Sequence, residues 1–112
     1  MATKIYSGKE SISSDQIFLV EKGKIYNGKY SISSDELKGI YPEGILIVDN
    51  TKIFKGQYAY SSEQILTVSK KNIYKGREID SSKQIGVIDG DRLNDDEFAK
   101  IIYLMAKKNN LL

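Results

Sequence analysis

The chain has 112 residues, the length of one domain with a modest hydrophobic core. Its 17 basic and 15 acidic residues leave a net charge of +2, which argues against a nucleic-acid partner. Cysteine and histidine are both absent, which removes disulfides, thiolate chemistry and histidine bases, and we expect no metal and no cofactor. No apolar stretch approaches the ~18 residues of a membrane helix, and we expect a soluble, cytoplasmic protein without a membrane partner.

A repeat organises most of the chain. A core of a basic residue or Asn, Ile, an aromatic residue, any residue and Gly begins at Lys4, Lys24, Lys52 and Asn72, with spacings of 20, 28 and 20 residues. Each core is followed by a serine pair, at Ser13-Ser14, Ser33-Ser34, Ser61-Ser62 and Ser81-Ser82, and then by a short apolar run, at 17–20, 45–48, 65–68 and 85–88. These constant offsets predict one domain built from units at about 4–23, 24–51, 52–71 and 72–91.

Each unit is predicted to contain two or three short strands. The apolar runs are short and β-branched, and a turn-like tetrapeptide joins them to the next Ile-aromatic pair, which is typical of a hairpin. The glycine of each core either closes a second tight turn or forms a bulge, and Asn27-Gly28 is the best candidate for a type I′ turn. Eight extra residues in the second unit, within 36–44, include Pro42 and predict a longer loop or an extended hairpin.

Twenty residues are too few for a propeller blade of ~40 residues. We therefore expect a mainly β fold, in which four pseudo-symmetric hairpin repeats close into a ring or a barrel-like arrangement. The expected closure pairs residues 4–8 with 85–88. The competing partner for the last strand is a decayed fifth copy at 91–96, which has lost the aromatic residue and the glycine.

The C-terminal segment changes to a helical period. Phe98, Ile101, Ile102 and Met105 share one face of a helix predicted at about 95–108, with Asn94 or Asp95 as its cap. Two interpretations stand: the helix is a lid on one face of the ring, or it forms a dimer or binds a partner.

The Ile-aromatic-x-Gly cores at 5–8, 25–28, 53–56 and 73–76, together with the unit length and the appended helix, resemble the bacterial 4-fold beta flower family. The resemblance covers residues 4–88. It implies a pseudo-fourfold arrangement of β-hairpins in a bacterial protein, and it brings no activity and no catalytic residues.

The candidate ligand-binding residues are the repeated aromatics and one copy-specific carboxylate. The aromatics, which are Tyr6, Tyr26, Phe54 and Tyr74, either form a stacking ring for a ligand near the axis or pack between hairpins. Asp80 stands where the other units have Ile12, Ile32 and Tyr60, and it is the candidate residue for a small carboxylate- or lysine-dependent enzyme. The serine pairs are predicted to form turns rather than phosphate or sugar sites, and the acidic residues at 89–96 a turn and helix start rather than a calcium site.

Because no unit contains a distinctive polar constellation, we expect a non-enzymatic binding or interaction module whose target is a protein, a glycan or a small ligand. The alternatives are a structural protein that forms homo-oligomers through its helix and, less favoured, the small enzyme. Whether the axis of the repeats is an open pocket or a packed core is the structural observation that would decide most among these functions.

Overall fold

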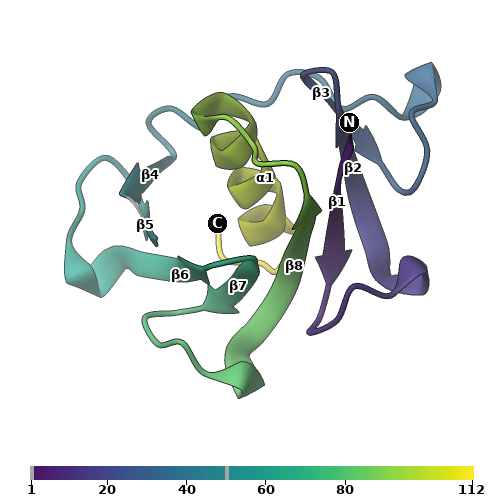
Figure 1. Cartoon of the computed structure of the whole chain (residues 1–112). Coiled ribbons are helices and arrows are strands. Elements are labelled where there is room, and N and C mark those ends of the chain that lie inside the picture. The colour runs from purple at the N-terminus through teal and green to yellow at the C-terminus, as the bar shows by residue number, and fades with distance from the viewer. Residues whose placement is uncertain (1, 50) are drawn as a thin grey trace.

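A computed structural model gives the fold of residues 2–49 and 51–112. These residues form one antiparallel eight-stranded sheet in the order β3-β2-β1-β8-β7-β6-β5-β4, and the sheet curves around a single helix (Figure 1). The strands are β1 (Ala2–Ser7), β2 (Gln16–Glu21), β3 (Lys24–Asn27), β4 (Leu46–Asp49), β5 (Lys52–Lys55), β6 (Gln64–Ser69), β7 (Asn72–Lys75) and β8 (Gln84–Gly90), and the helix is α1 (Asp95–Lys108). The expectation of a mainly β domain with a C-terminal helix at 95–108 is confirmed.

Each unit of the sequence contributes two strands, and the apolar run of one unit forms a hairpin with the Ile-aromatic strand of the next. In the β2–β3 turn, Lys22 and Gly23 have φ angles of 53° and 78°, the left-handed pair that a type I′ turn requires. The expectation of a type I′ turn at Asn27-Gly28 is wrong, because Asn27 is the last residue of β3 and only Gly28 has a positive φ.

The glycine of each core ends its strand. Its N–H donates to the first residue of the neighbouring apolar run, in the pairs Gly8–Ile85, Gly28–Ile17, Gly56–Ile45 and Gly76–Ile65. All of these glycines have φ between 85° and 97°, a conformation that side chains with a Cβ rarely adopt. The glycine therefore begins the longer loop that joins two paired strands in β1–β2, β5–β6 and β7–β8, and it forms neither a tight turn nor a bulge. The irregularities in the ladder lie on the facing strands beside Gln16, Gln64 and Gln84.

The first and last strands pair as expected. β1 and β8 are antiparallel neighbours, with Ile5 opposite Ile88 and Tyr6 opposite Val87. The decayed fifth copy does not compete for this place, because the chain leaves the sheet after Gly90 and enters α1. The Thr3 hydroxyl donates to the Asp91 carbonyl over 2.6 Å and ties the departing segment to β1.

The expectation of a closed ring is wrong, because the sheet is open between its two edge strands, β3 and β4. The second unit begins its internal pairing normally, with a bridge between Tyr26 and Glu36 and a hydrogen bond from the Leu37 N–H to the Ile25 carbonyl. The chain then departs through the extra residues and returns only at β4. Ile40 in this segment is buried in the core, so the insertion is a loop that packs inward and not an extended hairpin.

Helix α1 fills the space that the curved sheet encloses. Ile101, Ile102 and Met105 are fully buried in one cluster with the isoleucines of the strands. Asn94 accepts a hydrogen bond from the N–H of Glu97, whose carboxylate accepts one from the N–H of Asn94, which makes a capping box. The axis is therefore a packed core, and the apolar face of α1 is covered by its own sheet. No helix within residues 2–49 and 51–112 is long and apolar enough to cross a membrane.

One glycine explains how α1 is accommodated. Gly86 occupies the position that Phe18, Leu46 and Leu66 hold in the other units, and it faces the helix. A Cβ at Gly86 would lie 2.6 Å from Cε of Met105 and 3.1 Å from the Tyr6 carbonyl oxygen. The fourth unit therefore lacks a large side chain where Met105 enters the core.

Candidate functional site

The repeated aromatics lie on the side of the sheet away from α1. Successive residues of a strand point to opposite faces, and the isoleucine before each aromatic belongs to the core that contains the helix. Tyr6, Tyr26, Phe54 and Tyr74 are only 5–9% exposed, and each lies across from an apolar-run residue: Val87, Leu19, Ile47 and Thr67, respectively. The structure thus distributes these side chains along the outer face of a sheet whose axis is filled by α1.

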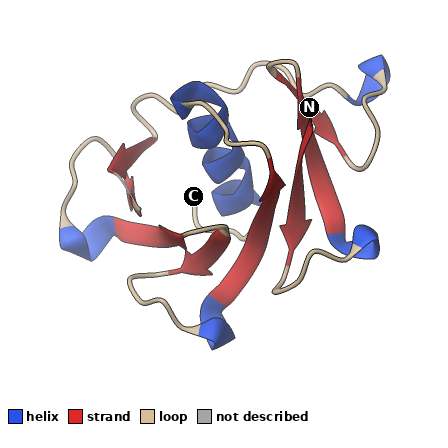
Figure 2. Ribbon diagram, viewed as in Figure 1, coloured by secondary structure: helices blue, strands red, loops and turns tan. Residues whose placement is uncertain are grey.

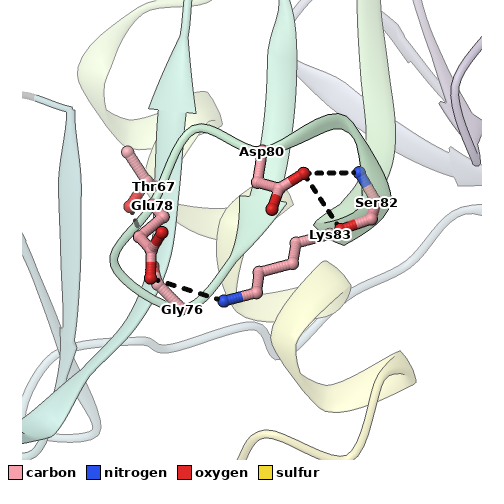
Figure 3. A network of polar contacts seen from close by, with 6 residues as sticks. All are labelled: Thr67, Gly76, Glu78, Asp80, Ser82 and Lys83. Carbon is pink, nitrogen blue, oxygen red and sulfur yellow. Dashed lines mark hydrogen bonds and ion pairs between the residues drawn. The ribbon is translucent and has the colours of Figure 1, made fainter.

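Asp80 lies at the surface, before the short 3-10 helix η4 (Ser81–Lys83). Its carboxylate accepts hydrogen bonds from the backbone N–H of Ser82, over 3.0 Å, and from the Ser82 hydroxyl, over 2.9 Å (Figure 3). These two hydrogen bonds, the backbone one first, lower the pKa of the Asp80 carboxyl below its usual value of 3.8. Asp80 lines neither of the two clefts described below, and its contacts are those of a helix cap.

Every serine pair forms the start of a 3-10 helix: η1 (Ser13–Asp15), η2 (Ser33–Asp35), η3 (Ser61–Glu63) and η4. The predicted turn role of the serines agrees with this geometry. Figure 2 shows these short helices at the outer margin of the fold, away from α1. Only η4 has a side-chain cap, since the residues before η1, η2 and η3 are Ile12, Ile32 and Tyr60.

A glutamine after the 3-10 helix links neighbouring units, and sequence reasoning missed it. Gln64 donates to the Thr67 hydroxyl over 2.9 Å, and that hydroxyl donates to the Gly76 carbonyl over 2.8 Å (Figure 3 shows the second bond). Gln16 reaches the corresponding Gly28 carbonyl directly, over 3.3 Å. The signal was available, because glutamine stands at this offset in three of the four units and glutamate in the remaining one. These bonds hold the base of the loops at 29–32 and 77–80, and Gln84 donates to the Lys9 carbonyl, over 3.4 Å, at the loop of residues 9–12.

The same loops expose large apolar side chains. Among the described residues, most of the exposed large hydrophobic side chains lie between the glycine and the serine pair: Ile12, Tyr30, Ile32, Tyr58, Tyr60 and Ile79. The rings of Tyr58 and Tyr60 lie 5.6 Å apart at an angle of 31°. The sequence contains a hint of this surface, because the four residues after the glycine vary among units while the glycine and the serines do not.

Two clefts flank the helix. The larger, of about 1060 Å³, is open and lies among the hairpin turns, where Val48, Ile88, Leu93 and Phe98 meet the polar residues Thr51, Lys70, Lys71, Asp91, Arg92 and Asp95. Its charges are mixed, and Lys71 also lies 3.8 Å from the Asp89 carboxylate. The smaller cleft, of about 230 Å³, separates residues 23–25 from the insertion.

Within the described residues, no group of three or more Asp, Glu, His or Cys side chains is arranged to hold a metal ion. Comparison of the chain with protein-family models, with curated proteins and with solved structures gives no match.

Proposed function

We propose that this chain is an interaction module that binds a protein partner through its glycine-to-serine loops, chiefly those at 29–32 and 57–60. The observation that carries the proposal is the exposure of Tyr30, Tyr58 and Tyr60, which are 68%, 62% and 61% exposed on loops whose ends are fixed. Exposed apolar surface that gathers on loops is a frequent mark of a protein–protein interaction site.

The chemistry of these loops suits protein recognition. Tyrosine offers a large, rigid contact area with few rotatable bonds and a hydroxyl for hydrogen bonding, and serine offers adaptable polar contacts. Loops that vary on a constant framework are a frequent arrangement of binding sites. Here the framework is the glycine and the 3-10 helix, and all four positions between the glycine and the serine pair vary. The second position holds Glu10, Tyr30, Tyr58 and Glu78, and the fourth holds Ile12, Ile32, Tyr60 and Asp80.

The experiment compares proteins retained from an extract of the producing cells by the immobilised chain and by a Tyr30→Ser/Tyr58→Ser/Tyr60→Ser variant. A contact tyrosine contributes about 2 kcal/mol, roughly thirtyfold in affinity. We expect at least one protein to be retained by the wild type and lost by the variant. The matched control is Tyr41→Ser, because Tyr41 is 73% exposed but lies on the insertion. Identical sets of proteins retained by the wild type and the triple variant would overturn the proposal.

We also propose a relationship between this chain and the 4-fold beta flower domains that its sequence resembles. The two-stranded units and the positive-φ glycines agree with such a relationship, whereas the open sheet departs from a fourfold closure, and the resemblance assigns no target.

A further inference from the structure

The edge strand β4 lacks one neighbour that its counterparts have. The apolar-run strands β2, β6 and β8 are each flanked on both sides by strands of the Lys-Ile-aromatic or Asn-Ile-aromatic type. β4, by contrast, pairs only with β5. The vacant place is the one that β3 would occupy if the inserted residues did not separate the two strands.

Side-chain exposure shows how much the missing neighbour leaves uncovered. Ile47 and Val48 are half-buried. The residues at the position of Ile47 in the other units, Leu19, Thr67 and Val87, are all buried. At the position of Val48, Val20 and Val68 are buried, whereas Ile88 is half-buried like Val48 itself. Ile45, just before the strand, is 40% exposed, whereas its counterparts Ile17, Ile65 and Ile85 are half-buried. Along β4, apolar surface is thus exposed to solvent, whereas in the other units an adjacent strand covers the equivalent surface.

The backbone of β4 indicates the same vacancy. The Ile45 carbonyl accepts a hydrogen bond from the Gly56 N–H, on the β5 side. Because these groups alternate along a strand, the N–H and C=O of Leu46 and Val48 point away from β5. Leu46 satisfies its N–H at the Pro42 carbonyl, over 3.1 Å. Val48 has no such acceptor among the described residues, whereas at the same position Val68 donates to Thr51 and Ile88 donates to Lys71, both over 2.7 Å.

The other edge of the sheet is better covered, since Glu36 and Leu37 pair with β3. Unpaired N–H and C=O groups on an edge strand are a template for an added strand. We infer that β4 is a docking site for an extended segment of a partner polypeptide with a basic-Ile-aromatic sequence, added antiparallel to β4. This inference concerns a different surface from the loop tyrosines and goes beyond the proposed function.

The chain itself gives the register of the added strand. Ile5 lies opposite Phe18 and Ile53 lies opposite Leu66. The equivalent register places the isoleucine of the partner opposite Leu46, and because the Leu46 N–H is already bonded to the Pro42 carbonyl, the added strand would accept its hydrogen bond from the Val48 N–H instead. The side chain of this isoleucine would point inward, over Val48 at the margin of the larger cleft, and the basic residue before it would lie opposite Ile47 on the outer face.

The test uses the full-length chain and a synthetic peptide that copies residues 22–29, Lys-Gly-Lys-Ile-Tyr-Asn-Gly-Lys, followed by amide chemical shifts in NMR. We expect saturable shifts centred on β4, with slower hydrogen exchange at the Val48 amide. A peptide with aspartate in place of the isoleucine should bind at least tenfold more weakly. Saturable shifts centred elsewhere, or equal binding of the two peptides, would overturn the inference.

Val48→Pro is the decisive variant, because it removes the edge-facing N–H and keeps the ladder to β5, and proline is tolerated on such edges. We expect it to weaken peptide binding at least tenfold, whereas Val48→Thr, which keeps the N–H, should bind as the wild type does. Amide spectra establish that each variant is folded. The triple tyrosine variant should bind the peptide normally, so this inference and the proposed function can fail separately. A wild-type dimer that Val48→Pro dissociates would identify a second copy as the occupant and overturn the assignment of a separate partner.

Discussion

The contact between Gly86 and Met105 permits a quantitative test of how α1 enters the sheet. In Gly86→Ala, the new Cβ would lie 2.6 Å from Cε of Met105, well inside van der Waals contact. Overpacking of this kind costs about 1–3 kcal/mol. Replacing glycine at a position that alanine can adopt returns about 0.4–1 kcal/mol through the unfolded chain, and Gly86 has no positive φ that would forbid alanine. We therefore expect a net destabilisation of about 1–2 kcal/mol from these two effects.

The thermodynamic partner of this variant is Met105→Ala. Met105 is fully buried, and its truncation should cost about 2–5 kcal/mol because it leaves a cavity. In that background the closest clash with Gly86→Ala has gone, and the new methyl group occupies part of the cavity. The double variant should therefore be more stable than the sum of the single effects predicts, by about 1–2 kcal/mol.

The assay is urea unfolding of the wild type, both single variants and the double variant, followed by circular dichroism with a common m-value. The packing argument is supported if Gly86→Ala alone lowers the free energy of unfolding and its coupling energy with Met105→Ala is favourable. Additive effects, within about 0.5 kcal/mol, would refute the conclusion that Gly86 is needed to admit Met105. Ala106 is also fully buried, but it is not among the atoms closest to a Cβ at Gly86. The control therefore repeats the cycle with Ala106→Gly instead of Met105→Ala.

Three further predictions concern the cap, a carboxylate and the insertion. Asn94→Ala should lower the free energy of unfolding by about 0.5–2 kcal/mol, measured by urea unfolding, while Asn94→Asp should retain most of it; equal stability of the alanine variant would contradict the capping role. Because the folded pKa of Asp80 is depressed, its contribution to stability is present above the unfolded pKa of 3.8 and is lost as the pH falls through the folded value. An NMR titration should show the depressed pKa, which Ser82→Ala should raise; an unshifted carboxyl would refute the hydrogen bonds. Deletion of residues 37–44 restores the 20-residue spacing, and β3 should then pair with β4. Slower hydrogen exchange of the Val48 amide would show this pairing, and rapid exchange would disprove it.

The repeat predicted the local structure well, because turn chemistry and apolar periodicity act over a few residues. The boundaries of α1 and the pairing of the chain's first and last strands both follow from it. The open ring could not be predicted, because the length of the insertion shows that residues were added but not that Ile40 would pack into the core. The buried position of the aromatics, such as Tyr74, was also undetermined. Alternation places isoleucine and aromatic on opposite faces without showing which face receives the helix.

For the candidate site, the sequence singled out the repeated aromatics and Asp80, and it did not single out the tyrosines of the loops. Asp80 stood out because it differs from the other units, and the difference proves to be a cap. Tyr58 and Tyr60 were not singled out, because a tyrosine near a strand end is as compatible with the core as with the surface. Only the course of the loop shows that both rings face solvent.

The pairing of β1 with β8 has a consequence for synthesis on the ribosome. Thr3 and Gly90 are opposite each other in the sheet, so β1 emerges long before its second neighbour exists. At about 5–20 residues per second, the wait lasts several seconds, and the fully buried residues of α1 follow later still. The nascent hairpins therefore lack the helix that completes their hydrophobic core until α1 has been translated. A stalled or truncated chain that stops before α1 should consequently be a target for chaperones or proteases rather than a stable smaller domain.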